Sequence, residues 1–89
     1  MASKTVKVGS SVGLHARPAT VIADAASAYD DEIILHLVGA ADDDDDADAG
    51  SSLMIMAMGA EQGDEVTVTS DNAEAVEKIA ELIASDLDA

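Results

Sequence analysis

The sequence predicts an α+β open-faced sandwich, in which short strands carry helices on one face. Two patterns lead to this fold class. Segments with apolar side chains at every second position, typical of half-buried strands, are interspersed with segments of helical periodicity. Because the strands alternate instead of forming continuous apolar runs, one solvated sheet face is favoured over strict βαβ units. The length of 89 residues leaves room for one domain, residues 1–89.

The N-terminal part contains a strand and a helix. Residues 4–8 alternate, with Val6 and Val8 on the face expected to be buried. A turn-rich loop follows. Alanine and isoleucine then recur at helical spacing from residue 16 to about 29. Pro18 fits the first turn of this helix, where an amide hydrogen has no intrahelical acceptor.

The middle of the chain contains a strand, an acidic loop and a short helix. Residues 32–38 are rich in Ile, Leu and Val and are predicted to form a strand. The acidic loop spans about residues 39–50, with a short edge strand expected near residues 47–49. A short helix is then predicted, because Ser51 is a good N-cap and Gly59 a natural stop.

The C-terminal part is predicted to be a strand over residues 65–69 and a final helix. Asp71 is expected to cap this helix, with Glu74 at the N3 position. Glu74 and Lys78 are spaced for an i,i+4 ion pair. The positions expected to be buried are Val76, Ile79, Ala80, Ile83 and Leu87.

The composition excludes several classes of protein. There is no cysteine, so disulfides, thiolate nucleophiles and thiolate zinc sites are ruled out. A net charge of −15 and a single aromatic ring, Tyr29, argue against nucleic-acid binding. No apolar run approaches the roughly 18 residues of a membrane span, and no export signal is recognisable, so we expect a cytoplasmic protein without membrane insertion. A small, highly charged chain is expected to be a monomer.

The acidic residues are spread over the whole chain, with 19 acids against 4 bases. A functional anionic patch would be local. We therefore predict a halophilic protein from a cell with molar internal salt, where acidic surfaces stay hydrated and their mutual repulsion is screened.

No dedicated metal site is expected. Asp44, Asp46 and Asp48 match the first, third and fifth positions of an EF-hand loop, but Ala49 and Ile55 stand where glycine and glutamate are required. The run is expected to be a solvated loop. The second histidine of the chain, His36, has no acidic or histidine partner at ligand spacing, so a structural or surface role is expected for it.

Residues 13–19, with the sequence GLHARPA, place a histidine at the junction of a glycine-containing loop and a helix. Helix N-termini stabilise anions, the Arg17 guanidinium suits phosphate oxygens, and a neutral imidazole is a competent nucleophile. His15 is therefore a candidate phosphoryl acceptor. On spacing alone, the alternative that His15 is a capping or loop residue and Arg17 a surface charge stays open.

The same string resembles the active-site motif of the histidine-containing phosphocarrier (HPr) family of the phosphoenolpyruvate-dependent sugar phosphotransferase system. Residues 51–59 (SSLMIMAMG) are similar to the regulatory-serine segment of that family. The resemblance covers nearly the whole chain, with an extension of about five residues in the acidic loop. It implies a four-stranded antiparallel sheet with three helices on one face.

The resemblance also implies roles for individual residues and no cofactor. His15 would accept a phosphoryl group through Nδ1 from enzyme I and donate it to a sugar-specific enzyme IIA. Arg17 would stabilise that group, and the amides of Ala16 and Arg17 would face it. Ser51 matches the serine that a dedicated kinase phosphorylates in some bacteria; its alternative role is that of an N-cap. The positions matching the partner surface of the family are Thr20, Leu53 and Met56.

Several alternatives remain open at the level of the sequence. Many relatives have lysines around the site, whereas the corresponding positions here include Asp24, Ser27 and Gly50. Partner choice is therefore expected to rest on apolar contact. The acceptor is open between a sugar-specific enzyme IIA, with fructose as one candidate, and a dihydroxyacetone kinase. A regulatory module of the same fold that carries no phosphoryl group is a further alternative.

Overall fold

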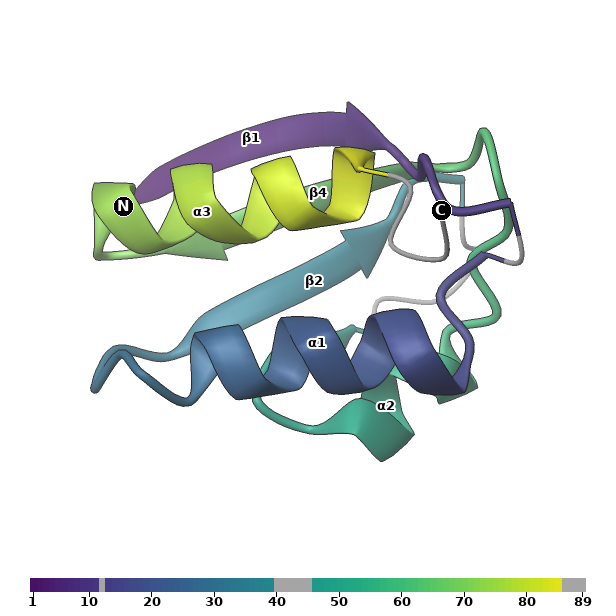
Figure 1. Cartoon of the computed structure of the whole chain (residues 1–89). Coiled ribbons are helices and arrows are strands. Elements are labelled where there is room, and N and C mark those ends of the chain that lie inside the picture. The colour runs from purple at the N-terminus through teal and green to yellow at the C-terminus, as the bar shows by residue number, and fades with distance from the viewer. Residues whose placement is uncertain (12, 40–45, 86–89) are drawn as a thin grey trace.

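The computed structural model describes residues 1–11, 13–39 and 46–85. Its elements are β1 (Ala2–Lys7), α1 (Ala16–Ala26), β2 (Ile33–Leu37), β3 (Ala47–Asp48), α2 (Ser52–Ala57), β4 (Glu65–Ser70) and α3 (Ala73–Ala84). The strands form one sheet in the order β1-β4-β2-β3, with every neighbouring pair antiparallel. Figure 1 shows α3 lying over β1 and β4, with α1 beside β2 and α2 next to α1. The predicted α+β open-faced sandwich is confirmed.

The alternating side chains of the strands separate the two faces of the sheet. Val66 and Val68 of β4 are fully buried, whereas Thr67 between them is half-buried. In the register of the sheet, Val68 lies opposite Leu35 of β2, and Val66 lies opposite Val6 of β1. These apolar pairs face the helices and fix the register, because a slip by one residue would turn every one of them to solvent.

The helices complete a single core. Buried residues of all three helices belong to one cluster with those of the strands. Ile22 of α1, Ile55 of α2 and Ile79 of α3 are each fully buried within it. Leu87, predicted to be buried by the last helix, lies outside the described residues.

The first helix is shorter than predicted. α1 ends at Ala26 instead of about residue 29. The hydroxyl of Ser27 donates to the carbonyl of Ala23 at 2.8 Å, and the amides of Ala28 and Tyr29 bond three residues back. This tighter turn satisfies the last carbonyls and ends the helix.

The predicted cap of the last helix is wrong by one residue. Asn72, not Asp71, is the N-cap of α3, and its side-chain oxygen accepts from the amide of Ala75 at 3.2 Å. The reason is that β4 continues to Ser70, whose hydroxyl oxygen accepts from the amide of Asn72 at 3.2 Å. Asp71 is exposed, and Glu74 lies in the first turn but not at N3.

The salt bridge of α3 also differs from the predicted one. Lys4 of β1 pairs with Glu77 at 2.9 Å. Within the described ranges, Lys78 makes no ion pair with Glu74. Both side chains of the observed pair are largely exposed, so its contribution to stability is small.

Candidate functional site

His15 lies at the N-cap of α1, at the end of the loop that follows β1. Its backbone is extended, with φ −86° and ψ −157°, and its carbonyl accepts the first intrahelical bond from Ala19 at 2.9 Å. The imidazole makes no capping hydrogen bond and is exposed. The ring therefore does not serve the helix as a cap, and it is accessible to a macromolecular donor.

The first turn of α1 is favourable for an anion. Amides of Ala16 and Arg17 have no intrahelical acceptor, and they lie at the positive end of the helix dipole. Although the chain carries a net charge of −15, no acidic residue occurs in this turn. The guanidinium of Arg17 is exposed and, among the described residues, makes no ion pair. It is therefore available to an anion bound at this end of the helix.

The loop that carries His15 is held by backbone contacts to the connection between α2 and β4. The amide of Leu14 donates to the carbonyl of Ala60 at 2.9 Å, and both residues are buried. Gly13 has φ +75°, in the left-handed region that favours glycine. Pro18 is buried in the first turn of α1, as the sequence predicted.

The three residues predicted for the partner surface lie on α1 and α2, which pack against each other. Leu53 is 75% exposed, and Thr20 is exposed although its hydroxyl donates to the carbonyl of Ala16 at 2.8 Å. Met56 is half-buried and packs against the core, so it contributes only part of its side chain. Of the three predicted surface residues, Leu53 is the one that exposes a large apolar side chain.

Met54 is a further exposed hydrophobic residue of α2, with 44% of its surface accessible. With about 100° of rotation per residue, a helix that buries Ile55 turns the two preceding side chains outward. Val21, which is 37% exposed on α1, was also missed. The helical rotation of α2 would have identified Met54 as exposed, but only after Ile55 was known to point inward.

Ser51 has a structural role that the structure defines. It is the N-cap of α2, and its hydroxyl oxygen accepts from the amide of Met54 at 3.3 Å. The side chain is half-buried. Gly59, with φ +70°, follows the end of the helix as predicted.

His36 has an acidic partner that the sequence did not reveal. Its Nδ1 lies 2.6 Å from a carboxylate oxygen of Asp46, ten residues further along the chain. The pair forms because Asp46 immediately precedes β3, the strand that is paired with β2. Ten residues of sequence separate the two side chains, so only the pairing of β2 with β3 brings them together.

The acidic segment does not form a metal centre within the described part of the chain. No cluster of three or more side chains there is arranged to hold a metal ion. Asp48, one of the three EF-hand-like positions, instead accepts from the amide of Gly50 at 2.9 Å. Asp44 lies outside the described residues.

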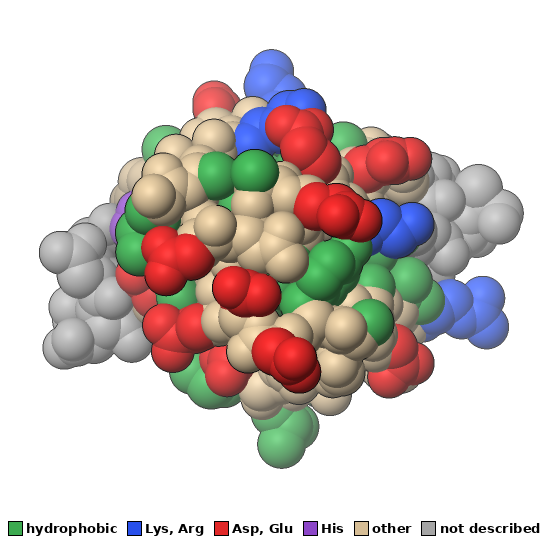
Figure 2. Space-filling view, turned by 90° about the vertical axis from the view of Figure 1, so that its left-hand side faces the viewer, with side chains coloured by type: hydrophobic (Ala, Val, Ile, Leu, Met, Phe, Trp, Pro, Cys, Tyr) green, Lys and Arg blue, Asp and Glu red, His purple; other side chains and the backbone are tan. Residues whose placement is uncertain are grey.

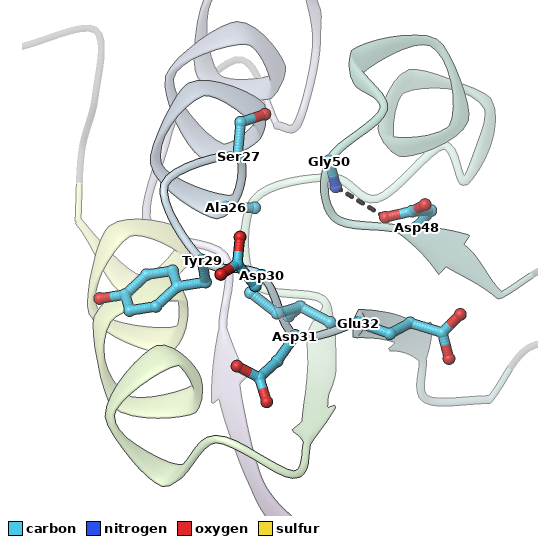
Figure 3. A pocket seen from close by; sticks show the side chains of 9 residues that line it. Ala26, Ser27, Tyr29, Asp30, Asp31, Glu32, Asp48 and Gly50 are labelled. Atoms are coloured by element: carbon cyan, nitrogen blue, oxygen red, sulfur yellow. Dashed lines mark hydrogen bonds between the residues drawn. The ribbon is translucent and has the colours of Figure 1, made fainter.

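A cavity of about 300 Å³ lies at the other end of α1, about ten residues from His15 along the helix axis. At 1.5 Å rise per residue this separation is roughly 15 Å. Figure 3 shows that the carboxylates of Asp31 and Glu32, two of its lining residues, point away from each other. The cavity is separate from the histidine, and no three of the acidic side chains in the described part of the chain are arranged to hold a metal ion.

Acidic side chains are distributed over the surface. Figure 2 shows them scattered across one face of the molecule, with hydrophobic and other side chains between them. No described helix is both long and apolar enough to cross a bilayer.

Comparisons with known proteins agree with this geometry. A family model described as the PTS HPr component phosphorylation site matches residues 2–85. The phosphocarrier protein HPr of Streptomyces coelicolor is 37% identical over 91 residues, covering 99% of this chain and 94% of that protein. The crystal structure of HPr-C-His from Thermoanaerobacter tengcongensis superimposes with a TM-score of 0.83 at 28% identity, covering 100% of this chain and 98% of that one. HPr from Bacillus anthracis superimposes with a TM-score of 0.80 at 27% identity, covering 92% and 95%.

Proposed function

The chain belongs to the HPr family of phosphotransferase-system phosphocarrier proteins, and from this premise we propose that His15 is the residue that carries the phosphoryl group. The protein is a carrier, not a catalytic enzyme. The observation that supports His15 is its exposed ring at the N-cap of α1, unused by the helix and next to unpaired amides and Arg17.

The transfer on His15 is a simple displacement at phosphorus. The lone pair of Nδ1 attacks the phosphorus atom presented by enzyme I, and a new N–P bond forms. The bond between phosphorus and the donor atom breaks, and the donor keeps its electron pair. In the second transfer the acceptor of enzyme IIA attacks, and Nδ1 of His15 becomes the leaving group.

The surroundings of His15 stabilise the transferred group without trapping it. The group adds roughly −1.5 to −2 charge, by analogy with phosphorylated hydroxyls. A helix N-terminus contributes about 0.3–1 kcal/mol toward such a charge, and a charge-assisted hydrogen bond from Arg17 about 1.5–3 kcal/mol. These energies are modest, so the group can still be released to an acceptor.

The apolar surface is the proposed docking site for both partners. Leu53, Met54 and Val21 are exposed hydrophobic side chains on α1 and α2, and Thr20 is exposed on α1. Flexible methionine side chains suit a surface that binds two partners in turn. The acceptor that we propose is a sugar-specific enzyme IIA, and fructose is the first sugar to test.

Ser51 is proposed to act here as a helix cap. Its hydroxyl oxygen already accepts from the amide of Met54, and its side chain is half-buried. If a kinase phosphorylated Ser51, the phosphate oxygens would have to accept the hydrogen bond from the Met54 amide in place of the hydroxyl oxygen. Such oxygens are strong acceptors at a helix N-terminus, so modification by a kinase is compatible with the cap.

We also propose that residues 1–89 act as one cytoplasmic, monomeric, halophilic domain. β1 at one end of the chain pairs with β4, and α3 near the other end packs against both of these strands. The excess of 19 acids over 4 bases supports the halophilic assignment.

The proposed function is tested by transfer of labelled phosphate from phosphoenolpyruvate, with enzyme I of the same organism in molar KCl. We expect acid-labile label on the wild type and none on His15→Ala. The matched control is His36→Ala, which removes the other histidine of the chain and should be labelled like the wild type. Correctly folded wild type without label would reject the carrier role in favour of a regulatory module.

A further inference from the structure

The loop that carries His15 rests on one short segment of backbone. Gly13 and Leu14 precede the histidine directly, and both contact Ala60 in the connection between α2 and β4. The amide of Leu14 donates to the carbonyl of Ala60 at 2.9 Å. An ideal Cβ on Gly13 would lie 2.5 Å from that same carbonyl oxygen and 3.0 Å from Cα of Glu61. The backbone of Gly13 and Leu14 is therefore in direct contact with the backbone of Ala60, and no side chain fits between them.

The supporting connection is itself held in shape. The carboxylate of Asp64 accepts from the amide of Glu61 at 2.9 Å, and the amide of Asp64 donates to the carbonyl of Glu61 at 2.9 Å. Val8 at the start of the histidine loop bonds to the carbonyl of Asp64 and accepts from the amide of Gly63. Residues 60–64 thus contact the histidine loop at both of its ends.

We infer that this connection, residues 60–64, positions His15 for phosphoryl transfer through the contact of Gly13 and Leu14 with Ala60. The inference rests on the proposed role of His15 as phosphoryl acceptor. Ala60, Asp64 and Gly13 are positioning residues, because none of them is the group that takes the phosphate. The contact between the Leu14 amide and Ala60 fixes the position of the backbone one residue before His15.

The geometry explains why a small displacement would matter. In-line attack requires the nucleophile to approach phosphorus within a narrow range of position, and a misplacement of about 1 Å can cost about 10²-fold in rate. A Cβ on Gly13 cannot be accommodated without moving either the histidine loop or the Ala60 carbonyl, which is backbone. The docking surface on α1 and α2 does not include these residues.

The chain offers a matched control for the glycine. Gly39 has φ +89° and Gly13 has φ +75°, so alanine is strained at both positions. At Gly39, however, a Cβ would meet no atom within 4 Å, and this glycine lies after β2, outside both the histidine loop and residues 60–64. Gly39→Ala therefore introduces the backbone strain without the collision with Ala60.

A second pair of variants leaves the histidine loop unaltered. Asp64→Ala removes the side-chain acceptor for the Glu61 amide, whereas Asp64→Asn keeps an amide oxygen that can accept the same bond. Both variants remove one negative charge, so a difference between them reports the hydrogen bond. Asp64 is exposed, and neither change disturbs the core.

The experiment measures kcat and KM of enzyme I for each variant as phosphoryl acceptor, in molar KCl. We expect Gly13→Ala to lower kcat by about 10²-fold with KM nearly unchanged, while Gly39→Ala transfers like the wild type. Asp64→Ala should lower kcat, and Asp64→Asn should restore it. Equal kcat values for the two glycine variants would overturn the inference. If Gly13→Ala does not fold, the comparison of Asp64→Ala with Asp64→Asn tests the inference, and equal kcat values for these two variants would overturn it.

Hydrogen exchange separates this inference from the proposed function. The Leu14 amide should exchange faster in Gly13→Ala than in Gly39→Ala, because only the former disturbs its bond to Ala60. This readout needs no phosphorylation. Wild type that takes up no phosphate rejects the proposed function, whereas unchanged Leu14 exchange in Gly13→Ala rejects the positioning contact.

Discussion

Arg17 is the residue that we propose stabilises the phosphoryl group by its charge. It is the single arginine of the chain, it lies in the first turn of α1, and its guanidinium has no ion-pair partner among the described residues. We predict that Arg17→Ala slows phosphoryl transfer by about ten- to a hundredfold, the equivalent of one charge-assisted hydrogen bond. Steady-state transfer from enzyme I measures this.

Lys78→Ala is the matched control for Arg17. It removes the same unit of positive charge from an exposed position on α3. We expect it to transfer at the wild-type rate. An equal loss in both variants would mean that total charge, and not the position of Arg17, governs the reaction.

At the level of single residues, the places of His15 and Arg17 in the fold could be predicted, and their roles stay predictions. The motif of residues 13–19 placed the histidine at a loop–helix junction, and the structure has it at the N-cap of α1 with Arg17 in the first turn. The partner of His36 could not be recognised in this way. Asp46 meets it only because two strands pair, and a spacing rule contains no information about strand pairing.

At the level of elements, the N-cap of α3 provides a direct test of local structure. Asn72 accepts from the Ala75 amide, whereas Asp71 is exposed. We predict that Asn72→Ala lowers the free energy of unfolding by about 0.5–2 kcal/mol and that Asp71→Ala changes it by less than about 0.5 kcal/mol. Urea unfolding in molar KCl measures both. A larger loss of unfolding free energy for Asp71→Ala than for Asn72→Ala would instead support Asp71 as the N-cap.

The order and type of the elements could be predicted because each strand and helix has its own apolar period. The ends of elements depended on side-chain hydrogen bonds. The hydroxyl of Ser70 bonds to the backbone just before α3, and the hydroxyl of Ser27 bonds to the backbone at the end of α1. Neighbouring polar residues could form similar bonds, so the sequence alone does not show which residue ends each element. Which side chains of α2 face solvent could be predicted only after Ile55 was known to point inward, and that depends on how the helix packs against the core.

At the scale of the whole molecule, the net charge of −15 on 89 residues should control stability. At low salt these charges repel one another and destabilise the compact state, and at 1 M the Debye length falls to about 3 Å. We predict that the melting temperature rises steeply with KCl concentration. A melting temperature that does not change between low and molar KCl would exclude the halophilic assignment.

The identity of the phosphorylated atom tests the carrier role most directly. Because the chain contains only two histidines, His15 and His36, ¹⁵N-histidine labelling gives two imidazole spin systems that His36→Ala assigns. After incubation with phosphoenolpyruvate and enzyme I in molar KCl, we expect phosphorus coupling at Nδ1 of His15 and an unchanged His36 ring. Phosphorylation at His36, or at neither ring of the folded protein, would contradict the assignment of His15 as the carrier residue.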